Sequence, residues 1–135
     1  MGDLSDLRAA AEAALRSGDY GALVPLIHQY ATEDFVTEWP QSGERLTRAM
    51  AAQMADYPEL SGMSPKFTLK RTLEGGDLLV FEGTIDYGDG TPVSYVGIAE
   101  TRDGKVARMT EYFANPFERP AWREGITELM TPTPA

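Results

Sequence analysis

The sequence has no cysteine and only one histidine, His28. Without cysteine the chain cannot form a disulfide, a thiolate nucleophile or a cysteine-ligated metal site. A single histidine also leaves a histidine-rich metal site without enough ligands in one chain. We therefore expect neither a bound metal nor a cofactor.

Positive charge and long apolar runs are also scarce. The sequence has 12 Lys and Arg against 21 Asp and Glu, which gives a net charge of −9. An acidic surface repels phosphate backbones, and no cluster of Lys and Arg favours an anionic membrane. No apolar run is long enough to span a bilayer, and residues 1–18 lack the apolar centre of a signal peptide. We expect no nucleic-acid or membrane partner, and a cytoplasmic location.

The length and composition favour one domain. Of the 135 residues, 42% are hydrophobic, which is enough for a single core. We expect this domain to cover residues 1–130, with a disordered Thr/Pro tail over residues 131–135.

Apolar residues at helical spacing mark the first part of the chain. Leu7, Ala11 and Leu15 predict a helix over residues 3–16 that ends at Gly18. Two further helices are predicted, over residues 19–30 and from residues 42–44 to Met54.

The rest of the chain has mostly the two-residue period of strands. Strands are predicted over residues 35–39, 66–73 and 78–87, and on both sides of the Asp103-Gly104 turn. A short helix is predicted over residues 120–130. Trp122 in this helix is expected to hold the C-terminal segment against the domain.

Two Asp-Gly turns allow the strands to be paired by counting. If Asp89-Gly90 and Asp103-Gly104 are each two-residue turns, Ile85 faces Ser94 and Glu100 faces Ala107. One face of the sheet is then mostly apolar, and we expect helices to cover it. Its predicted members are Leu79, Phe81, Gly83, Ile85, Ser94, Val96, Ile98, Glu100, Ala107, Met109, Glu111 and Phe113.

The opposite face of the predicted sheet is rich in Thr, Tyr and Val. Its predicted members include Val80, Thr84, Tyr95, Val106, Thr110 and Tyr112. An exposed sheet face of this composition is typical of an interface. We therefore expect a homodimer that forms through the outer sheet face.

Glu111 is the one carboxylate predicted in the middle of the apolar face. A carboxylate in that position needs a hydrogen-bond partner or it takes up a proton. Such groups in pockets are candidate acids or bases. The alternative is a structural glutamate that hydrogen-bonds a tyrosine or tryptophan and orders the core.

Two segments carry a resemblance to a known family. They are EWPQSGERL over residues 38–46 and EYFANPFERPAWR over residues 111–123. Together they resemble a bacterial subgroup of the SnoaL-like proteins in the nuclear transport factor 2-like superfamily. The resemblance implies an α+β, cone-shaped, cystatin-like fold, in which three N-terminal helices pack on a curved antiparallel sheet around an apolar pocket.

The activities known for this fold can be compared with the residues of this chain. Steroid isomerases use an Asp where this chain has Trp39, a Tyr near Ala11 and a second acid near Val96 or Gly97, so their machinery is absent. Limonene-epoxide-hydrolase-like enzymes need Asp and Arg inside the pocket, and the predicted inner face has neither. SnoaL-type polyketide cyclases use one acidic residue as general acid and base, and Glu111 fits that role.

Two functional hypotheses therefore remain. The first is an enzyme that performs acid/base chemistry on a small apolar, cyclic or carbonyl-bearing metabolite, as an isomerase, cyclase or dehydratase. The second is a non-catalytic module that binds a hydrophobic ligand or acts as an accessory dimer. The candidate catalytic residues are Glu111, His28 and Tyr57. The candidate ligand-binding residues are Tyr30, Trp39, Phe81, Val96, Ile98, Met109 and Phe113.

Overall fold

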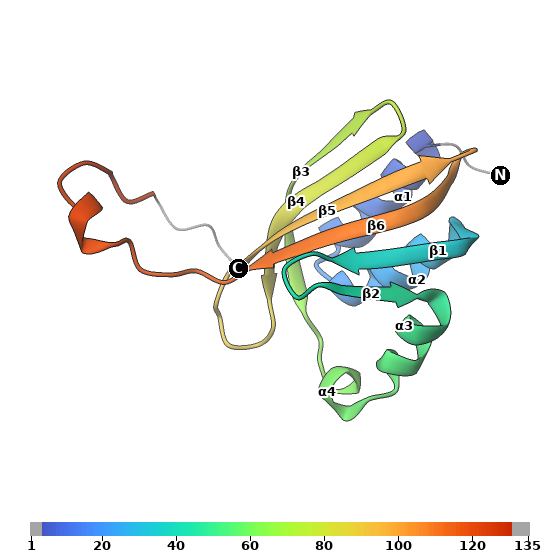
Figure 1. Cartoon of the computed structure of the whole chain (residues 1–135), viewed down its shortest axis with the longest axis horizontal. Coiled ribbons are helices and arrows are strands. Elements are labelled where there is room, and N and C mark those ends of the chain that lie inside the picture. Colours follow the sequence, from blue (N-terminus) through green and yellow to red (C-terminus); the bar gives the residue numbers. More distant parts are fainter. Residues whose placement is uncertain (1–3, 131–135) are drawn as a thin grey trace.

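The computed structural model describes residues 4–130. The predicted helix start at Asp3 and the predicted tail over residues 131–135 lie outside the described residues. Helices cover one face of a curved, unclosed sheet of six strands (Figure 1). This confirms the predicted α+β fold.

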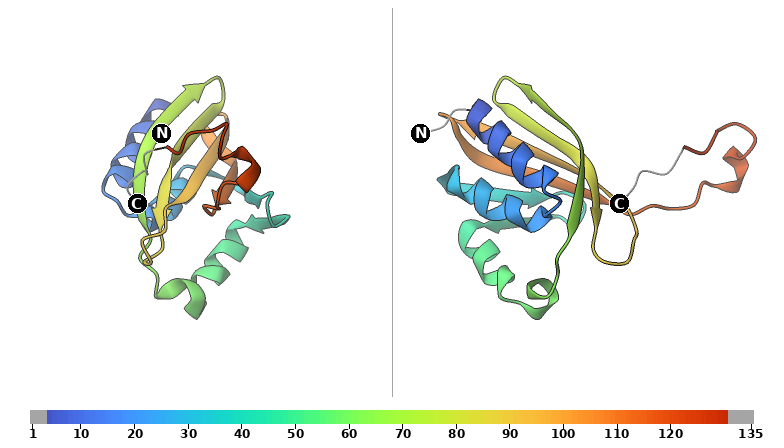
Figure 2. Two further views of the ribbon diagram at one scale, coloured as in Figure 1. Left: turned by 90° about the vertical axis from the view of Figure 1, so that its left-hand side faces the viewer. Right: turned by 180° about the vertical axis from the view of Figure 1, so that it is seen from behind.

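Two N-terminal helices pack against the inner face of the sheet (Figure 2). Helix α1, Leu4–Arg16, buries Leu7, Ala11 and Leu15 completely, because these residues lie four apart on one side of the helix. Gly18 then takes a φ of 87°, a left-handed conformation that favours glycine.

The segment after Gly18 is divided into two short helices. A 3-10 turn, η1, covers Tyr20–Ala22, and α2 covers Leu23–Gln29. Pro25 is the third residue of α2, where the missing N–H breaks no helical hydrogen bond. The predicted single helix over residues 19–30 therefore exists only in its second part.

The predicted start of the third helix is wrong. Strand β1, Ala31–Trp39, turns at residues 40–43 and pairs with strand β2, Glu44–Thr47. Helix α3, Arg48–Ala55, begins only after Thr47, whose side-chain oxygen accepts a hydrogen bond from Met50 N at 3.2 Å. A short helix α4, Pro58–Ser61, follows.

Four long strands complete the sheet. They are β3, Lys66–Gly75; β4, Leu78–Asp86; β5, Val93–Arg102; and β6, Lys105–Ala114. The spatial order is β2-β1-β6-β5-β4-β3. All neighbouring strands are antiparallel except β1 and β6, which are parallel.

The predicted register of β5 is wrong by one residue at both ends. The Asp89-Gly90 turn belongs to a loop over residues 87–92, so Ile85 pairs with Val93 and not with Ser94. At the other hairpin Ala107 is an extra residue in a β-bulge, and Glu100 pairs with Arg108.

A shift of one residue turns every side chain of β5 to the other face. Tyr95, Gly97 and Ala99 therefore lie on the inner face, whereas Val96 and Ile98 lie on the outer face. The same bulge buries Val106 completely. Residues 79, 81, 83 and 85 of β4, and residues 109, 111 and 113 of β6, lie on the inner face as predicted.

The C-terminal segment departs most from the prediction. In place of a helix over residues 120–130 there is one 3-10 turn, η2, Ala121–Arg123. Residues 115–130 run away from the domain as an extended arm, here named the C-terminal arm (Figure 1). Trp122 is 74% exposed, so it does not hold this segment against the domain.

None of the helices in residues 4–130 combines the length and the apolar character needed to cross a membrane. The cytoplasmic location stays a prediction.

Candidate functional site

Glu111 lies on the inner face of β6 and is 8% exposed. Its carboxylate accepts three hydrogen bonds from aromatic side chains. The hydroxyls of Tyr20 and Tyr95 donate to Oε2 at 2.8 and 2.6 Å, and Nε1 of Trp39 donates to Oε1 at 3.0 Å. These donors stabilise a negative charge that is largely removed from water.

Three separate elements bring these donors together. Tyr20 begins η1, and its backbone N–H donates to Pro65 O at 3.3 Å, which ties η1 to the start of β3. Trp39 is the last residue of β1 before Pro40, and Tyr95 lies within β5, opposite Phe113 on β6.

Gly97 makes room for the hydroxyl of Tyr95. It is paired with Glu111 across the β5–β6 ladder. A Cβ placed on Gly97 would overlap the Tyr95 hydroxyl and lie 2.8 Å from Cε of Met109. A side chain at position 97 would therefore occupy the place from which Tyr95 reaches Glu111.

Aromatic rings surround the carboxylate. Tyr95 has its ring centroid 5.4 Å from Tyr20, 5.5 Å from Phe67 and 5.4 Å from Phe113. Phe113 also lies 6.4 Å from Trp39 in an edge-to-face arrangement. This cluster limits the access of water to Glu111 from the sheet side.

Burial and the charge of Glu111 keep the two tyrosines protonated. Burial, followed by the charge of Glu111, raises the pKa of both Tyr20 and Tyr95 well above the usual value of a phenol. Both therefore remain hydrogen-bond donors throughout the physiological pH range.

Glu111 also forms part of the wall of a small cavity between α2, β1 and β6. The cavity volume is about 40 Å³. Its lining is Leu23, Val24, Ile27, His28, Phe35, Thr37, Met109 and Glu111. The volume suits water rather than a drug-sized ligand, which needs roughly 300–1,000 Å³. A ligand-sized apolar pocket therefore stays a prediction.

His28 is the second ionisable group in the lining of this cavity. Its ring lies 5.6 Å from Phe35, edge to face. Burial, and then the positive charge of Arg48, lower the pKa of His28 below its ordinary value. The imidazole is therefore mainly neutral at pH 7 and carries one N–H donor and one acceptor nitrogen.

The structure brings only some of the predicted residues to Glu111. Trp39 binds it directly, and Met109 and His28 line the cavity with it. Phe113 belongs to the aromatic cluster around Glu111, and Tyr30 and Phe81 pack in the core.

Three predicted site residues lie elsewhere. Val96 and Ile98 lie on the outer face because of the register shift. Tyr57 is exposed and lines a different groove, of about 200 Å³, with Met50, Gln53 and Met54. None of these three lines the cavity beside Glu111.

Tyr20 and Tyr95 were not predicted as site residues. Tyr95 was predicted on the outer face because a two-residue Asp89-Gly90 turn gives β5 a register one residue away from the observed one; the β4–β5 loop has six residues, 87–92. Tyr20 follows Gly18 outside any periodic apolar stripe, so the sequence gives no local signal for it.

Within residues 4–130 no three His, Asp or Glu side chains gather closely enough to hold a metal ion.

A curved sheet with helices on one face and a buried carboxylate inside defines a class of small α+β domains. Within this class, the chain belongs to the family of the SnoaL-like domain, whose model matches residues 7–109.

Solved structures agree with this family. An NTF-2 like protein of unknown function from Burkholderia xenovorans is 32% identical, covers 94% of this chain and 97% of its own, and has a TM-score of 0.71. A candidate ketosteroid isomerase from Kribbella flavida is 26% identical and has a TM-score of 0.74. The match covers 95% of this chain and 92% of that protein's chain.

More distant structures show the fold alone. An LEH-like epoxide hydrolase from M. tuberculosis is 19% identical, covers 81% of this chain and 83% of its own, and has a TM-score of 0.57. A search of the curated proteins finds no match.

Proposed function

We propose that this protein is an enzyme that performs acid/base chemistry on a small apolar molecule with a carbonyl group. The observation that carries this proposal is the buried Glu111 carboxylate, which lines the same small cavity as the neutral imidazole of His28. Two ionisable groups in an otherwise mostly apolar lining are a common arrangement for proton transfer.

The two oxygens of Glu111 have different roles in this proposal. Oε2 accepts hydrogen bonds from two tyrosines, whereas Oε1 has the single donor Trp39 and keeps a lone pair for a substrate. Glu111 takes a proton from the carbon next to the carbonyl, and the C–H electron pair moves into an enolate. His28 donates a hydrogen bond to the enolate oxygen, and the proton then returns to carbon.

The cavity must widen to admit such a molecule. Its outer wall is α2, a helix of seven residues whose Val24 is already 46% exposed. An outward shift of α2 would expose part of Leu23 and Ile27, so in this proposal the binding of substrate must offset that cost. Binding of substrate is therefore coupled to an outward shift of α2 in this proposal.

Hydrogen–deuterium exchange at carbon tests this function without the natural substrate. The probes are cyclohexanone, a Δ5-3-ketosteroid and polyporic acid, the molecule with which the distant fold relative TerC was co-crystallised. For the two ketones we expect the protein to accelerate exchange of the α-hydrogens with D₂O, followed by NMR. Polyporic acid serves as a binding probe. Glu111→Gln should lower the exchange rate by about 100-fold or more.

The matched control is Glu100→Gln, because Glu100 is a half-exposed carboxylate on β5 outside the cavity. We expect the Glu100→Gln variant to accelerate exchange of the ketones' α-hydrogens as much as the unchanged protein does. Equal exchange rates for Glu111→Gln and Glu100→Gln, with both variants folded by circular dichroism, would dismiss Glu111 as the base.

A second candidate function is non-catalytic binding of a hydrophobic ligand. It is favoured by the three protein donors that already hold Glu111, an arrangement also suited to a structural carboxylate. Calorimetry combined with the exchange measurement separates the enzyme from the binding module. A ketone probe that binds tightly by calorimetry, but whose carbon-bound hydrogens do not exchange faster, supports the binding module.

We also propose that the protein is a homodimer that pairs through its outer sheet face. The corrected register moves Tyr95 and Val106 from the predicted interface into the core, and adds Val96 and Ile98 to a face that the helices leave uncovered (Figure 2). Light scattering should give twice the chain mass of 14.8 kDa at micromolar concentration. A monomer at that concentration would contradict the proposal.

A further inference from the structure

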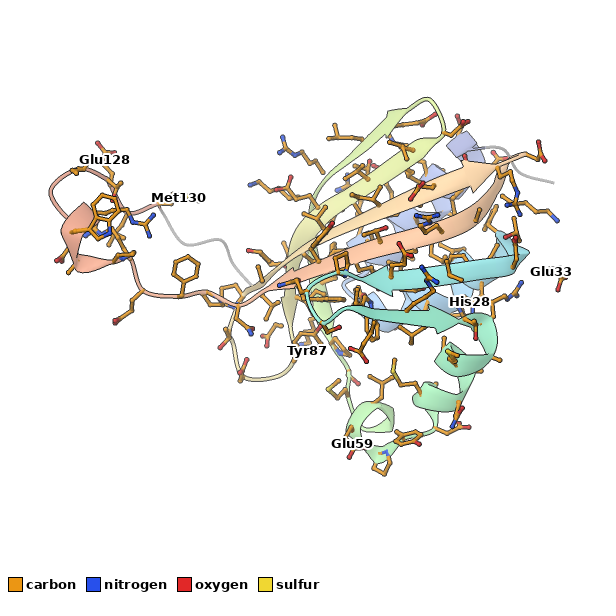
Figure 3. All side chains as sticks on the ribbon, viewed as in Figure 1. His28, Glu33, Glu59, Tyr87, Glu128 and Met130 are labelled. Atoms are coloured by element: carbon orange, nitrogen blue, oxygen red, sulfur yellow. The ribbon has the colours of Figure 1, made fainter. Side chains whose placement is uncertain are left out.

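The C-terminal arm exposes more apolar surface than any other segment of residues 4–130. It leaves β6 and runs clear of the sheet, with Glu128 and Met130 near its far end (Figure 3). Five large apolar side chains of the arm are mostly exposed to solvent. Their exposed fractions are 83% for Phe117, 74% for Trp122, 75% for Ile126, 76% for Leu129 and 82% for Met130. Five large apolar side chains exposed within fourteen residues (117–130) are typical of an interaction segment.

The arm has a defined conformation of its own. Nη1 of Arg119 donates to Thr127 O at 2.9 Å, and the Thr127 hydroxyl donates to Arg123 O at 3.1 Å. The backbone N–H of Ile126 also donates to Arg123 O, at 3.0 Å. Trp122 and Ile126 are therefore presented from a hydrogen-bonded loop, which lowers the entropy cost of binding through these two side chains.

The surroundings of Arg123 are incomplete. Its guanidinium lies 5.7 Å from the ring centroid of Trp122. Its Nε is shielded from solvent and has no hydrogen-bond partner among the described residues. Shielded polar atoms are nearly always hydrogen-bonded, so this Nε is an unsatisfied donor of the arm within residues 4–130 of a single chain.

We propose that the C-terminal arm docks on a second copy of this chain, so that each copy gives its arm to the other. The arm is continuous with the outer sheet face: Tyr112, 40% exposed on that face, precedes Phe117 by five residues. The sheet face also carries ion pairs, such as Arg108 with Glu100 and Arg71 with Glu82, so sheet face and arm form one continuous surface of mixed character. In a dimer with two-fold symmetry, the same surface of each copy contacts the other copy, so the arm of each copy is docked.

The area of the arm agrees with what a stable dimer needs. Large aromatic side chains bury about 150–250 Å² each, so Phe117 and Trp122 alone offer roughly 300–500 Å² per arm, and the three aliphatic side chains add to this area. A standard interface buries about 800 Å² on each partner. Two exchanged arms supply most of that area before the sheet faces are counted.

The fluorescence of Trp122 tests the exchange directly. The fluorescence of a Trp122→Phe variant comes from Trp39 alone, so subtracting it leaves the signal of Trp122. Acrylamide quenching at a series of protein concentrations then reports how exposed Trp122 is. We expect Trp122 to be shielded in the dimer and to become quenchable on dilution, at the concentration where light scattering detects dissociation.

Two results of the quenching experiment would overturn the proposal. Trp122 that is quenched freely in the dimer shows that the arm stays exposed. Trp122 that is shielded in the monomer shows that the arm folds onto its own domain. Neither result bears on hydrogen exchange at Glu111, so the proposed enzyme function is judged separately.

Variants of the arm give a second measurement. Phe117→Ser combined with Leu129→Ser should raise the dimer dissociation constant by about 10,000-fold, since each of the two arms loses two anchors and each anchor is worth about tenfold. The matched control is Met50→Ser on α3, a 52% exposed apolar residue outside the arm. Equal dissociation constants for the arm variant and the control would contradict the exchange.

Discussion

At the scale of single residues, Gly97 decides how Glu111 is held. Because a Cβ at this position would overlap the Tyr95 hydroxyl, Gly97→Ala should displace the ring and break its hydrogen bond to Glu111. We expect the free energy of unfolding to fall by about 2 kcal/mol, as for other overpacked cores. Urea unfolding followed by circular dichroism measures this change.

The control for Gly97→Ala is Gly75→Ala, because a Cβ on Gly75 meets no atom within 4 Å. Its stability should change by less than about 0.5 kcal/mol. Tyr95→Phe completes a double-mutant cycle: if Gly97 acts through Tyr95, the two changes together cost less than their sum. Full additivity would show that Gly97 serves only backbone packing.

At the scale of elements, what the sequence predicts depends on how locally an element is determined. The α1 stripe of Leu7, Ala11 and Leu15 needs only helical spacing, and the predicted helix exists. Strand β5 instead depends on its two neighbours. A loop longer than two residues and a bulge at Ala107 shift it, and no residue pattern within β5 reveals either.

Strand β2 was missed for a related reason. Its four residues, Glu44–Thr47, are too few to establish a two-residue period, and they lie directly before α3. The signal that remains is Thr47, which caps α3 through Met50 N. A cap at Thr47 places the start of the helix after the strand.

The candidate site depends on both kinds of element. Glu111 was predicted on the inner face because Met109 and Phe113 flank it at two-residue spacing, and the bulge at Ala107 lies before this stretch and does not interrupt it. Its partners Tyr20 and Tyr95 were not predicted, because one follows a glycine turn and the other lies on the shifted strand. A carboxylate can thus be located from one strand, whereas its hydrogen bonds require the whole fold.

At the scale of the whole molecule, the net charge of −9 opposes the proposed dimer. Two acidic copies repel each other, while the main contacts proposed to join them are the apolar side chains of the sheet faces and arms. Salt screens the repulsion, since the screening length falls from about 20 Å at 20 mM to about 7 Å at 200 mM, and it leaves apolar contacts intact. We therefore expect the dimer dissociation constant to fall by about tenfold between 20 and 200 mM NaCl, measured by sedimentation equilibrium. A dimer that weakens as salt is added would instead be held by ion pairs across the interface, and the apolar sheet face and arms would not be its main contacts.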